Sequence, residues 1–205
     1  MSYDKPNCGQ FVAQRIRYLV GDNPSHLRPT SRAMLAQLRQ AAGQEPGTVP
    51  SVWPITTEGL PEYREPTATR AETAIHIALT QFAIHQQAKS SSMHDPATPF
   101  GRAVRRLANL SSSDGEPQES PVYARFTALS STTSVPGILA HSRGIITQLR
   151  SHDIGFDYAR YADDLYWLQV PGAAGRVHRR WGRDFHRLFV PHPTLDNTSI
   201  EGASA

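Results

Sequence analysis

Apolar residues recur with the period of an α-helix along most of the chain. The strongest case is 69–88, TRAETAIHIALTQFAIHQQA, where apolar residues stand at i, i+3, i+4 and i+7 from Ile75. Ile77 and Ile84 widen this apolar stripe beyond one helix face. The pattern therefore predicts that 69–88 is the central helix of the fold.

The same periodicity predicts seven further helices and no sustained strand, so we expect an all-α helical protein, built either as one domain with two lobes or as two compact bundles. The expected helices cover 10–20, 31–42, 99–110, 121–130, 134–151, 157–169 and 173–189. Thr30 or Ser31 is expected to cap the second of these segments, which Gly43 ends. Thr98 is expected to cap the third, with a proline at its first helical position.

Polar and proline-rich tracts divide these helices into two groups. Residues 44–68 are rich in proline and predict a long loop. The tract SSSDGEPQES at 111–120 separates an expected N-terminal lobe, 1–110, from an expected C-terminal bundle, 121–190. Residues 191–205 are expected to form a flexible tail.

Composition narrows the function classes. The chain has 205 residues, 39% of them hydrophobic, and no run reaches the roughly 18 apolar residues of a membrane span. The first twenty residues lack the apolar stretch of a signal peptide, so we expect a cytoplasmic protein that has no membrane partner. Cys8 is the only cysteine, which excludes an intrachain disulfide and argues against a cysteine metal site.

The histidines give no metal signature, and we expect no cofactor. His76 and His85 are nine residues apart on one expected helix, which places them on opposite sides. His178 and His186 are eight apart, but no third ligand stands at a suitable spacing beside them.

The stretch RYADDLYW, 160–167, matches the Tyr-x-Asp-Asp hairpin of reverse transcriptases, whose aspartates bind magnesium. Its flanks have helical period instead, and Asp157 is placed as an N-cap. Adjacent residues of a helix diverge by about 100°, so Asp163 and Asp164 converge poorly on one metal. We expect a solvated helix face on which Arg160 pairs with Asp164, and we expect no catalytic residues.

Arginine placement carries more information than the net charge of +3. Only Lys5 and Lys89 among the 21 basic residues are lysines, and a GC-rich genome would produce the same bias. Within 99–110, three arginines lie opposite the apolar stripe with no acid beside them, which favours contact with a nucleic-acid backbone. They are Arg102, Arg105 and Arg106.

A second arginine stripe lies within 173–189. It consists of Arg176, Arg180, Arg183 and Arg187, at i, i+4, i+7 and i+11. The expected helix 157–169 precedes it and carries Asp163 and Asp164. We therefore favour pairing with these aspartates over phosphate contact for this stripe.

An ordered set of motifs resembles the CasB family, the small subunits of the type I-E CRISPR surveillance complex Cascade. The motifs are HIALTQFAIHQQ (76–87), MH (93–94), FGRAVRRL (100–107), RFTALSST (125–132), HSRGIITQLRSHDIGFDYARYADDLYWLQ (141–169) and WGRDF (181–185). The resemblance implies an all-α, two-lobed helical bundle protein without catalytic activity that is present as a pair of copies. Its implied partners are the backbone and large Cascade subunits, a second copy of itself, crRNA and target DNA. It also implies a role in holding the target DNA and the displaced strand.

The resemblance also implies a nucleic-acid surface. Matched by position, its residues are Arg39, Arg102, Arg125 and Arg143, to which helix geometry adds Arg32, Arg105 and Arg106. The chain departs from the family at Ser142 and Phe100, where leucine is more usual. We expect Trp53, Trp167 and Trp181 to be core or interface anchors. Two alternatives stay open: a stand-alone nucleic-acid-binding helical protein, and a structural adaptor whose arginines contact protein carboxylates.

Overall fold

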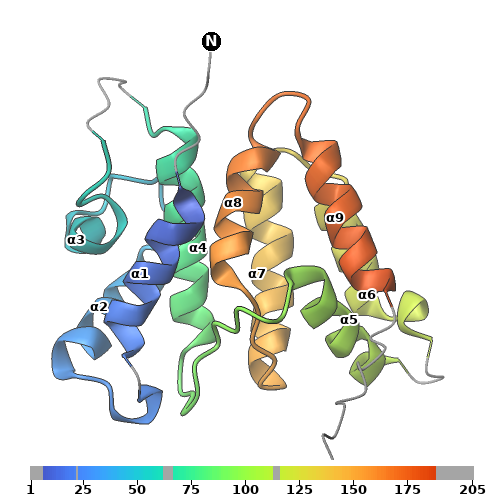
Figure 1. Ribbon diagram of the computed structural model, residues 1–205, viewed down its shortest axis with the longest axis horizontal. Helices are drawn as coiled ribbons and strands as arrows, with labels where there is room; N and C mark the ends of the chain where they lie inside the picture. The colour runs from blue at the N-terminus through green and yellow to red at the C-terminus, as the bar shows by residue number, and fades with distance from the viewer. Residues whose placement is uncertain (1–6, 22, 62–66, 113–115, 188–205) are drawn as a thin grey trace, which may run out of the picture.

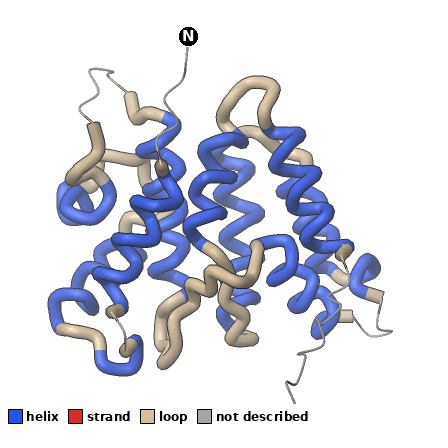
Figure 2. The backbone as a smooth tube through the Cα atoms, viewed as in Figure 1, coloured by secondary structure: helices blue, strands red, loops and turns tan. Residues whose placement is uncertain are grey.

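The computed structural model describes residues 7–21, 23–61, 67–112 and 116–187 (Figure 1). Within these ranges the chain forms α-helices and short 3-10 helices and no strand (Figure 2). The all-α class expected from the periodicity is confirmed. No helix in the described ranges is long and apolar enough to cross a membrane.

All eight helices expected from the sequence are present, and their ends differ by at most three residues from the expected ends. The α-helices are α1 (Cys8–Val20), α2 (Pro29–Gln40), α3 (Trp53–Thr56), α4 (Arg70–His85), α5 (Phe100–Ser111), α6 (Pro121–Ser130), α7 (Val135–Ser151), α8 (Tyr158–Leu168) and α9 (Ala174–His186). The 3-10 helices are η1 (Pro24–His26), η2 (Pro50–Val52) and η3 (Pro117–Glu119).

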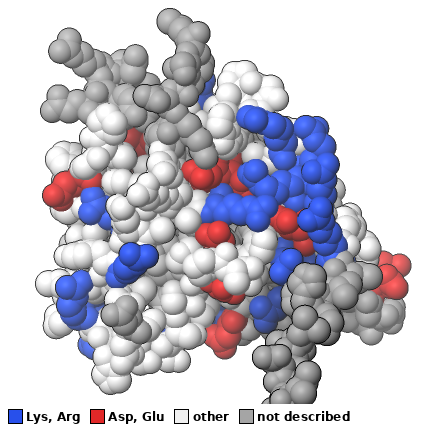
Figure 3. All heavy atoms as spheres, viewed as in Figure 1, with Lys and Arg blue, Asp and Glu red and all other residues white. Residues whose placement is uncertain are grey.

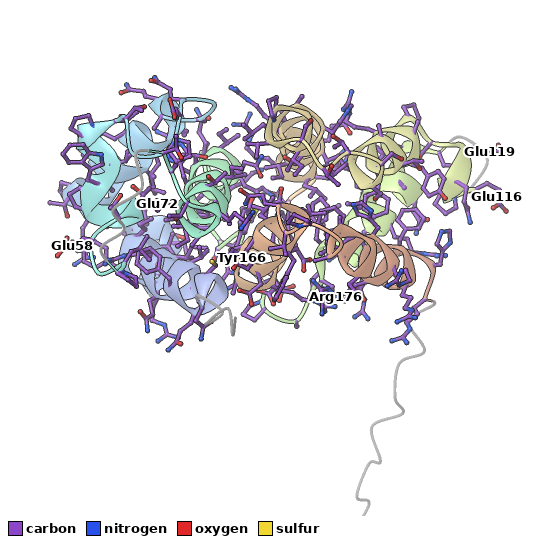
Figure 4. The ribbon with its side chains drawn as sticks, turned by 90° about the horizontal axis from the view of Figure 1, so that it is seen from above. Glu58, Glu72, Glu116, Glu119, Tyr166 and Arg176 are labelled. Atoms are coloured by element: carbon purple, nitrogen blue, oxygen red, sulfur yellow. The ribbon has the colours of Figure 1, made fainter. Side chains whose placement is uncertain are left out.

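The helices pack in two layers, with α4 between them in one half of the molecule and α5 packed against α6, α7 and α9 in the other. Helices α1, α8 and α9 lie side by side on one face of the molecule, and α2, α7 and α6 lie on the opposite face (Figures 1 and 4). Helix α4 lies between the layers and contacts α1, α2, α7 and α8. The prediction that this segment is the central helix is confirmed, because nearly every side of α4 is buried.

The start of α4 is fixed by a capping box. The Thr69 hydroxyl accepts from the Glu72 backbone N–H at 3.2 Å, and the Glu72 carboxylate accepts from the Thr69 N–H at 2.8 Å. This pair satisfies two backbone donors that a helix N-terminus otherwise leaves without partners. The helix that carries most of the core therefore begins at a defined residue.

Two expected caps and one expected loop are corrected by the structure. Helix α2 begins at Pro29 with Arg28 as its cap residue, because proline at the first helical position presets the backbone. Thr98 does not cap α5, since its hydroxyl donates to the Asp95 carboxylate at 2.6 Å. The expected loop 44–68 includes η2 and α3, which bury Ile55 against the core.

A single cluster of buried apolar residues extends from α1 to α9. Helix α8 belongs to the later half of the chain, yet it packs closely against α1 and α4. The division into 1–110 and 121–190 stays a prediction. Residues 191–205, the expected tail, lie outside the described part of the chain.

Candidate nucleic-acid interface

The tandem aspartates lie in the middle of α8 and point to different neighbours. Asp163 Oδ1 accepts a 3.0 Å hydrogen bond from the Gly9 N–H at the start of α1. Asp164 lies beside α9 instead, where its Oδ2 accepts from Trp181 Nε1 at 2.6 Å. The two carboxylates therefore hold α8 against different helices and do not converge on one metal.

The expected solvated, salt-bridged face is wrong for Asp164, which is only 1% exposed. Arg180 of α9 forms the ion pair with this buried carboxylate. The expected pairing of Arg160 with Asp164 is also wrong, because Arg160 pairs with Asp184 at 3.1 Å. The charged residues of α8 therefore pair with residues of α9, which the spacing of charges within α8 did not indicate.

A basic surface lies on the layer formed by α2, α7 and α6. We call it the α2–α7 basic surface, and it consists of Arg32, Arg39, Lys89, Arg125, Arg143 and Arg150. Four of its members were expected from the sequence, whereas Lys89 and Arg150 were not. It contains charges from three helices and from the loop after α4.

A pocket of about 380 Å³ forms the α2 end of this surface. Arg32, Arg39 and Lys89 line it together with uncharged residues of α2, η1 and the loop that follows α4. Arg32 and Arg39 are seven residues apart on α2 and so share one face. Three cationic side chains around one hollow suit an anionic group such as phosphate.

Arg150 joins the α2 pocket to α7. Partial burial, followed by repulsion from nearby Arg150, lowers the pKa of Arg39. Arg150 Nη1 donates to Gln87 Oε1 at 2.8 Å, and Gln87 lines the pocket. Lys89 pairs with Asp153, which offsets part of its charge.

Arg143 and Arg125 extend the surface toward α6. Arg143 is exposed on α7 and is seven residues before Arg150, so the two share a helix face. Arg125 of α6 lies across the backbone of α7, where a Cβ added at Gly144 would be 3.1 Å from Arg125 Cδ. The absence of a side chain at Gly144 lets Arg125 lie close against α7.

The sequence pattern missed Lys89 and Arg150 for identifiable reasons. Lys89 follows the end of α4, outside any helical stripe. Arg150 was not singled out because no other cation lies within one turn of it on α7. Its spacing of seven from Arg143 was the available signal.

The three arginines of α5 are not equivalent. Arg105 Nη1 donates to the Phe185 carbonyl at 3.0 Å, and its guanidinium lies 6.0 Å from the Phe185 ring centre. Arg105 therefore ties α5 to the end of α9, and its expected contact with a nucleic-acid backbone stays a prediction. Arg102 is half-buried and Arg106 is exposed.

The α9 arginines gather on the opposite face from the α2–α7 basic surface (Figure 3). The expected pairing with acids is confirmed for Arg180, which forms an ion pair with Asp164 and also feels the charge of Asp163. Within the described ranges, no ion pair is recorded for Arg179, Arg183 or Arg187. This face therefore keeps positive charge after its internal pairs are formed.

The histidines have structural surroundings. His76 Nε2 lies 3.2 Å from the Ala41 carbonyl, whereas His85 Nδ1 lies 3.0 Å from the Tyr158 hydroxyl. The two side chains thus lie in different parts of the core, as their spacing predicted. No cluster of three potential metal ligands occurs among the residues that the structure describes.

Comparison with known proteins places this arrangement in a family. The family model for CRISPR-associated protein Cse2 matches residues 34–186. The crystal structure of CasB from Thermobifida fusca is similar, with 33% sequence identity and a TM-score of 0.70, over 90% of this chain and 100% of that chain. No curated protein matches the sequence significantly.

Two further solved structures, both of proteins from Thermus thermophilus, share the fold at lower identity. A CRISPR-associated protein of the Cse2 family has 22% identity and a TM-score of 0.64, over 86% of this chain and 96% of that chain. A CasB structure has 21% identity and a TM-score of 0.62 over the same shares. The family model and the Thermobifida fusca structure both cover most of the chain, and the chain therefore belongs to the Cse2/CasB family of CRISPR-associated proteins.

Proposed function

We propose that this chain is a non-catalytic small subunit of a type I-E CRISPR RNA-guided surveillance complex. In this role its α2–α7 basic surface holds phosphates of the crRNA, the target DNA or the displaced strand, and so stabilises the opened R-loop. The observation that carries the proposal is the convergence of Arg32, Arg39 and Lys89 around one hollow. Arg150 lies outside it, close enough to lower the pKa of Arg39 and to donate to Gln87 of its lining. Its partners would be the backbone and large subunits and a second copy of itself.

The energetics of strand exchange favour such a role. Replacing a DNA duplex by an RNA–DNA hybrid is nearly balanced in free energy, so backbone contacts decide whether the opened state persists. Arginine–phosphate contacts release counterions and do not read sequence. A subunit that must accept any target sequence needs this kind of contact.

The tandem aspartates support the absence of catalysis in this proposal. Both are engaged in holding helices together, through the Gly9 N–H and through Trp181 and Arg180. A carboxylate committed to a buried ion pair is a poor ligand for a metal that must exchange substrate. The polymerase-like motif therefore has a structural explanation.

The test is charge reversal of two exposed members of the surface, Arg32→Glu combined with Arg143→Glu, in the assembled complex. We expect normal assembly and weaker retention of target DNA in gel shifts at several salt concentrations. For each lost contact, the slope of log affinity against log salt should become shallower by about 0.9 for duplex or 0.7 for single strand. Matched and mismatched targets should keep their ratio of affinities.

The control is Arg17→Glu, an equal charge change at an exposed position of α1, on the opposite layer. This variant should retain DNA like the wild type. Unchanged affinity and slope in a fully assembled double variant would overturn the proposal. Loss of assembly with the double variant alone would favour the structural adaptor, and tight DNA binding by the isolated chain would favour the stand-alone binding protein.

A further inference from the structure

A largely apolar cavity of about 320 Å³ lies where α8 ends and α4 begins. Its walls are the side chains of Arg70, Tyr166, Trp167, Val170 and Pro171. Figure 4 shows Tyr166 on the α8 side of the molecule, away from the layer that carries the α2–α7 basic surface. The proposed function does not use this cavity.

The indole of Trp167 is held in place by two neighbours. The Tyr166 ring meets it edge to face, with ring centres 5.3 Å apart. The Arg176 guanidinium lies over the indole, 4.7 Å from the ring centre. Trp167 lines the cavity and Arg176 does not, so a part of the Trp167 side chain that Arg176 leaves uncovered faces the cavity.

Arg176 is also the first arginine of α9. From it, the cationic side chains of α9 continue toward Arg187, over roughly 16 Å at 1.5 Å per residue. Arg179, Arg183 and Arg187 are exposed along this path. The aromatic cavity therefore lies at one end of a row of cations.

We infer that this cavity takes one unpaired base of a single-stranded nucleic acid whose phosphates lie along the α9 arginines. Proteins that bind single strands without sequence preference combine a cationic track for the backbone with aromatic side chains on which bases stack. Trp167 provides the ring, and Arg176 above it adds a cation that strengthens the stack. The inference rests on the proposed nucleic-acid binding but assigns it a second face.

The chemistry of the cavity favours a base over an acidic peptide. Four of its five lining residues are apolar or aromatic. Its one charged residue, Arg70, already donates from Nε to the Gln169 carbonyl at 3.1 Å. A carboxylate placed in the cavity would find little solvation there, whereas a flat heterocycle matches the exposed indole surface.

The test measures binding of the full-length chain to two fluorescent strands by anisotropy. One strand is oligothymidine, and the other is an abasic sugar–phosphate strand of the same length. We expect Trp167→Leu to weaken oligothymidine binding about fivefold or more, the range for loss of one stacked base. The same variant should bind the abasic strand like the wild type, because only the base contact is removed.

Two further variants keep the outcome interpretable. Arg176→Gln changes an exposed side chain, and it should weaken oligothymidine binding and make the salt slope shallower by about 0.7. Trp53→Leu is the matched control, because Trp53 is 47% exposed on α3 and does not line the cavity. It should leave both affinities unchanged.

The inference and the proposed function fail in different ways. Arg32→Glu with Arg143→Glu leaves the cavity intact, so this variant should still prefer oligothymidine to the abasic strand. If folded Trp167→Leu and Arg176→Gln variants bind oligothymidine like the wild type, the cavity inference is overturned while the proposed function stands. Equal weakening of both strands by Trp167→Leu would also overturn it.

Discussion

The indole of Trp181 donates a 2.6 Å hydrogen bond to the carboxylate of Asp164, and both residues are 1% exposed. Arg180, one residue before Trp181, forms an ion pair with the same carboxylate. The second aspartate of the polymerase-like motif is therefore part of a buried contact between α8 and α9. A charge buried in this way is stable only while its partners are present.

Replacing Asp164 by asparagine should destabilise the fold by about 1–3 kcal/mol, because Arg180 loses its counter-charge in a half-buried site. Arg180 is 35% exposed at its side chain, so solvent limits the cost. Urea denaturation of Asp164→Asn measures the change. A free energy of unfolding within error of the wild type would contradict the buried contact of Asp164 with Arg180. Loss of a metal-dependent nucleotidyl transfer activity would contradict the structural explanation of the motif.

Gly101 allows α5 to approach α9. A Cβ at this position would lie 2.4 Å from the Trp181 carbonyl oxygen, closer than real contacts allow. Gly101→Ala should therefore destabilise the protein by about 1–3 kcal/mol through overpacking. Thermal and urea unfolding measure this loss.

The matched control for Gly101 is Gly182 of α9, around which an added Cβ meets no atom within 4 Å. Gly182→Ala should stabilise the protein by roughly 0.5–1 kcal/mol, since alanine loses less backbone freedom in a helix. If Gly101→Ala and Gly182→Ala changed the free energy of unfolding by similar amounts, α5 and α9 would not approach as closely at Gly101 as the structure shows.

Substitutions of Arg105 and of Arg106 on α5 should differ in their effect on the stability of the fold. Arg105 donates to the Phe185 carbonyl, whereas Arg106 is exposed. Arg105→Gln should lower the free energy of unfolding by about 1 kcal/mol, and Arg106→Gln should leave it within about 0.5 kcal/mol of the wild type. Urea denaturation of both variants checks this difference, and a reversed order of stability would count against the Arg105 contact.

Stability should fall as the pH is lowered below neutrality, in part because of His85. Burial, followed by the charges of Lys89 and Arg150, lowers the pKa of His85 from 6.5 to about 3. The unfolded chain then binds a proton that the folded chain excludes, so stability is full above about pH 6.5 and is lost as the pH falls toward 3. His85 alone should contribute up to about 1.4 kcal/mol per pH unit in this window.

The His85→Gln variant removes this titrating group. Urea denaturation at several pH values between 4 and 7 should give a shallower pH dependence for the variant than for the wild type. His76 and His94 also have a pKa lowered by burial, so a part of the dependence should persist in the variant. Identical pH profiles for the two proteins would contradict a neutral His85 in the core.

Sequence by itself determined the helices, because their signals are local. The stripe of 69–88 recurs within a few turns, and Asp157 caps α8 by accepting from the Ala159 and Arg160 N–H groups nearby. The ordered motifs also indicated the family, and the divergence of Asp163 and Asp164 followed from helix geometry alone. None of these inferences needed to know which helices meet.

Only the tertiary structure decided what each charge contacts, because a side chain's partners depend on helices that are distant in sequence. Arg160 pairs across to α9 and not within α8, and Arg105 donates to a carbonyl 80 residues away. Arg150 gained its place beside Arg39 when α4 brought α2 and α7 to the same face. Periodicity predicts which face of a helix is polar, whereas packing decides whether a cation on that face is used inside the fold or stays available for a partner.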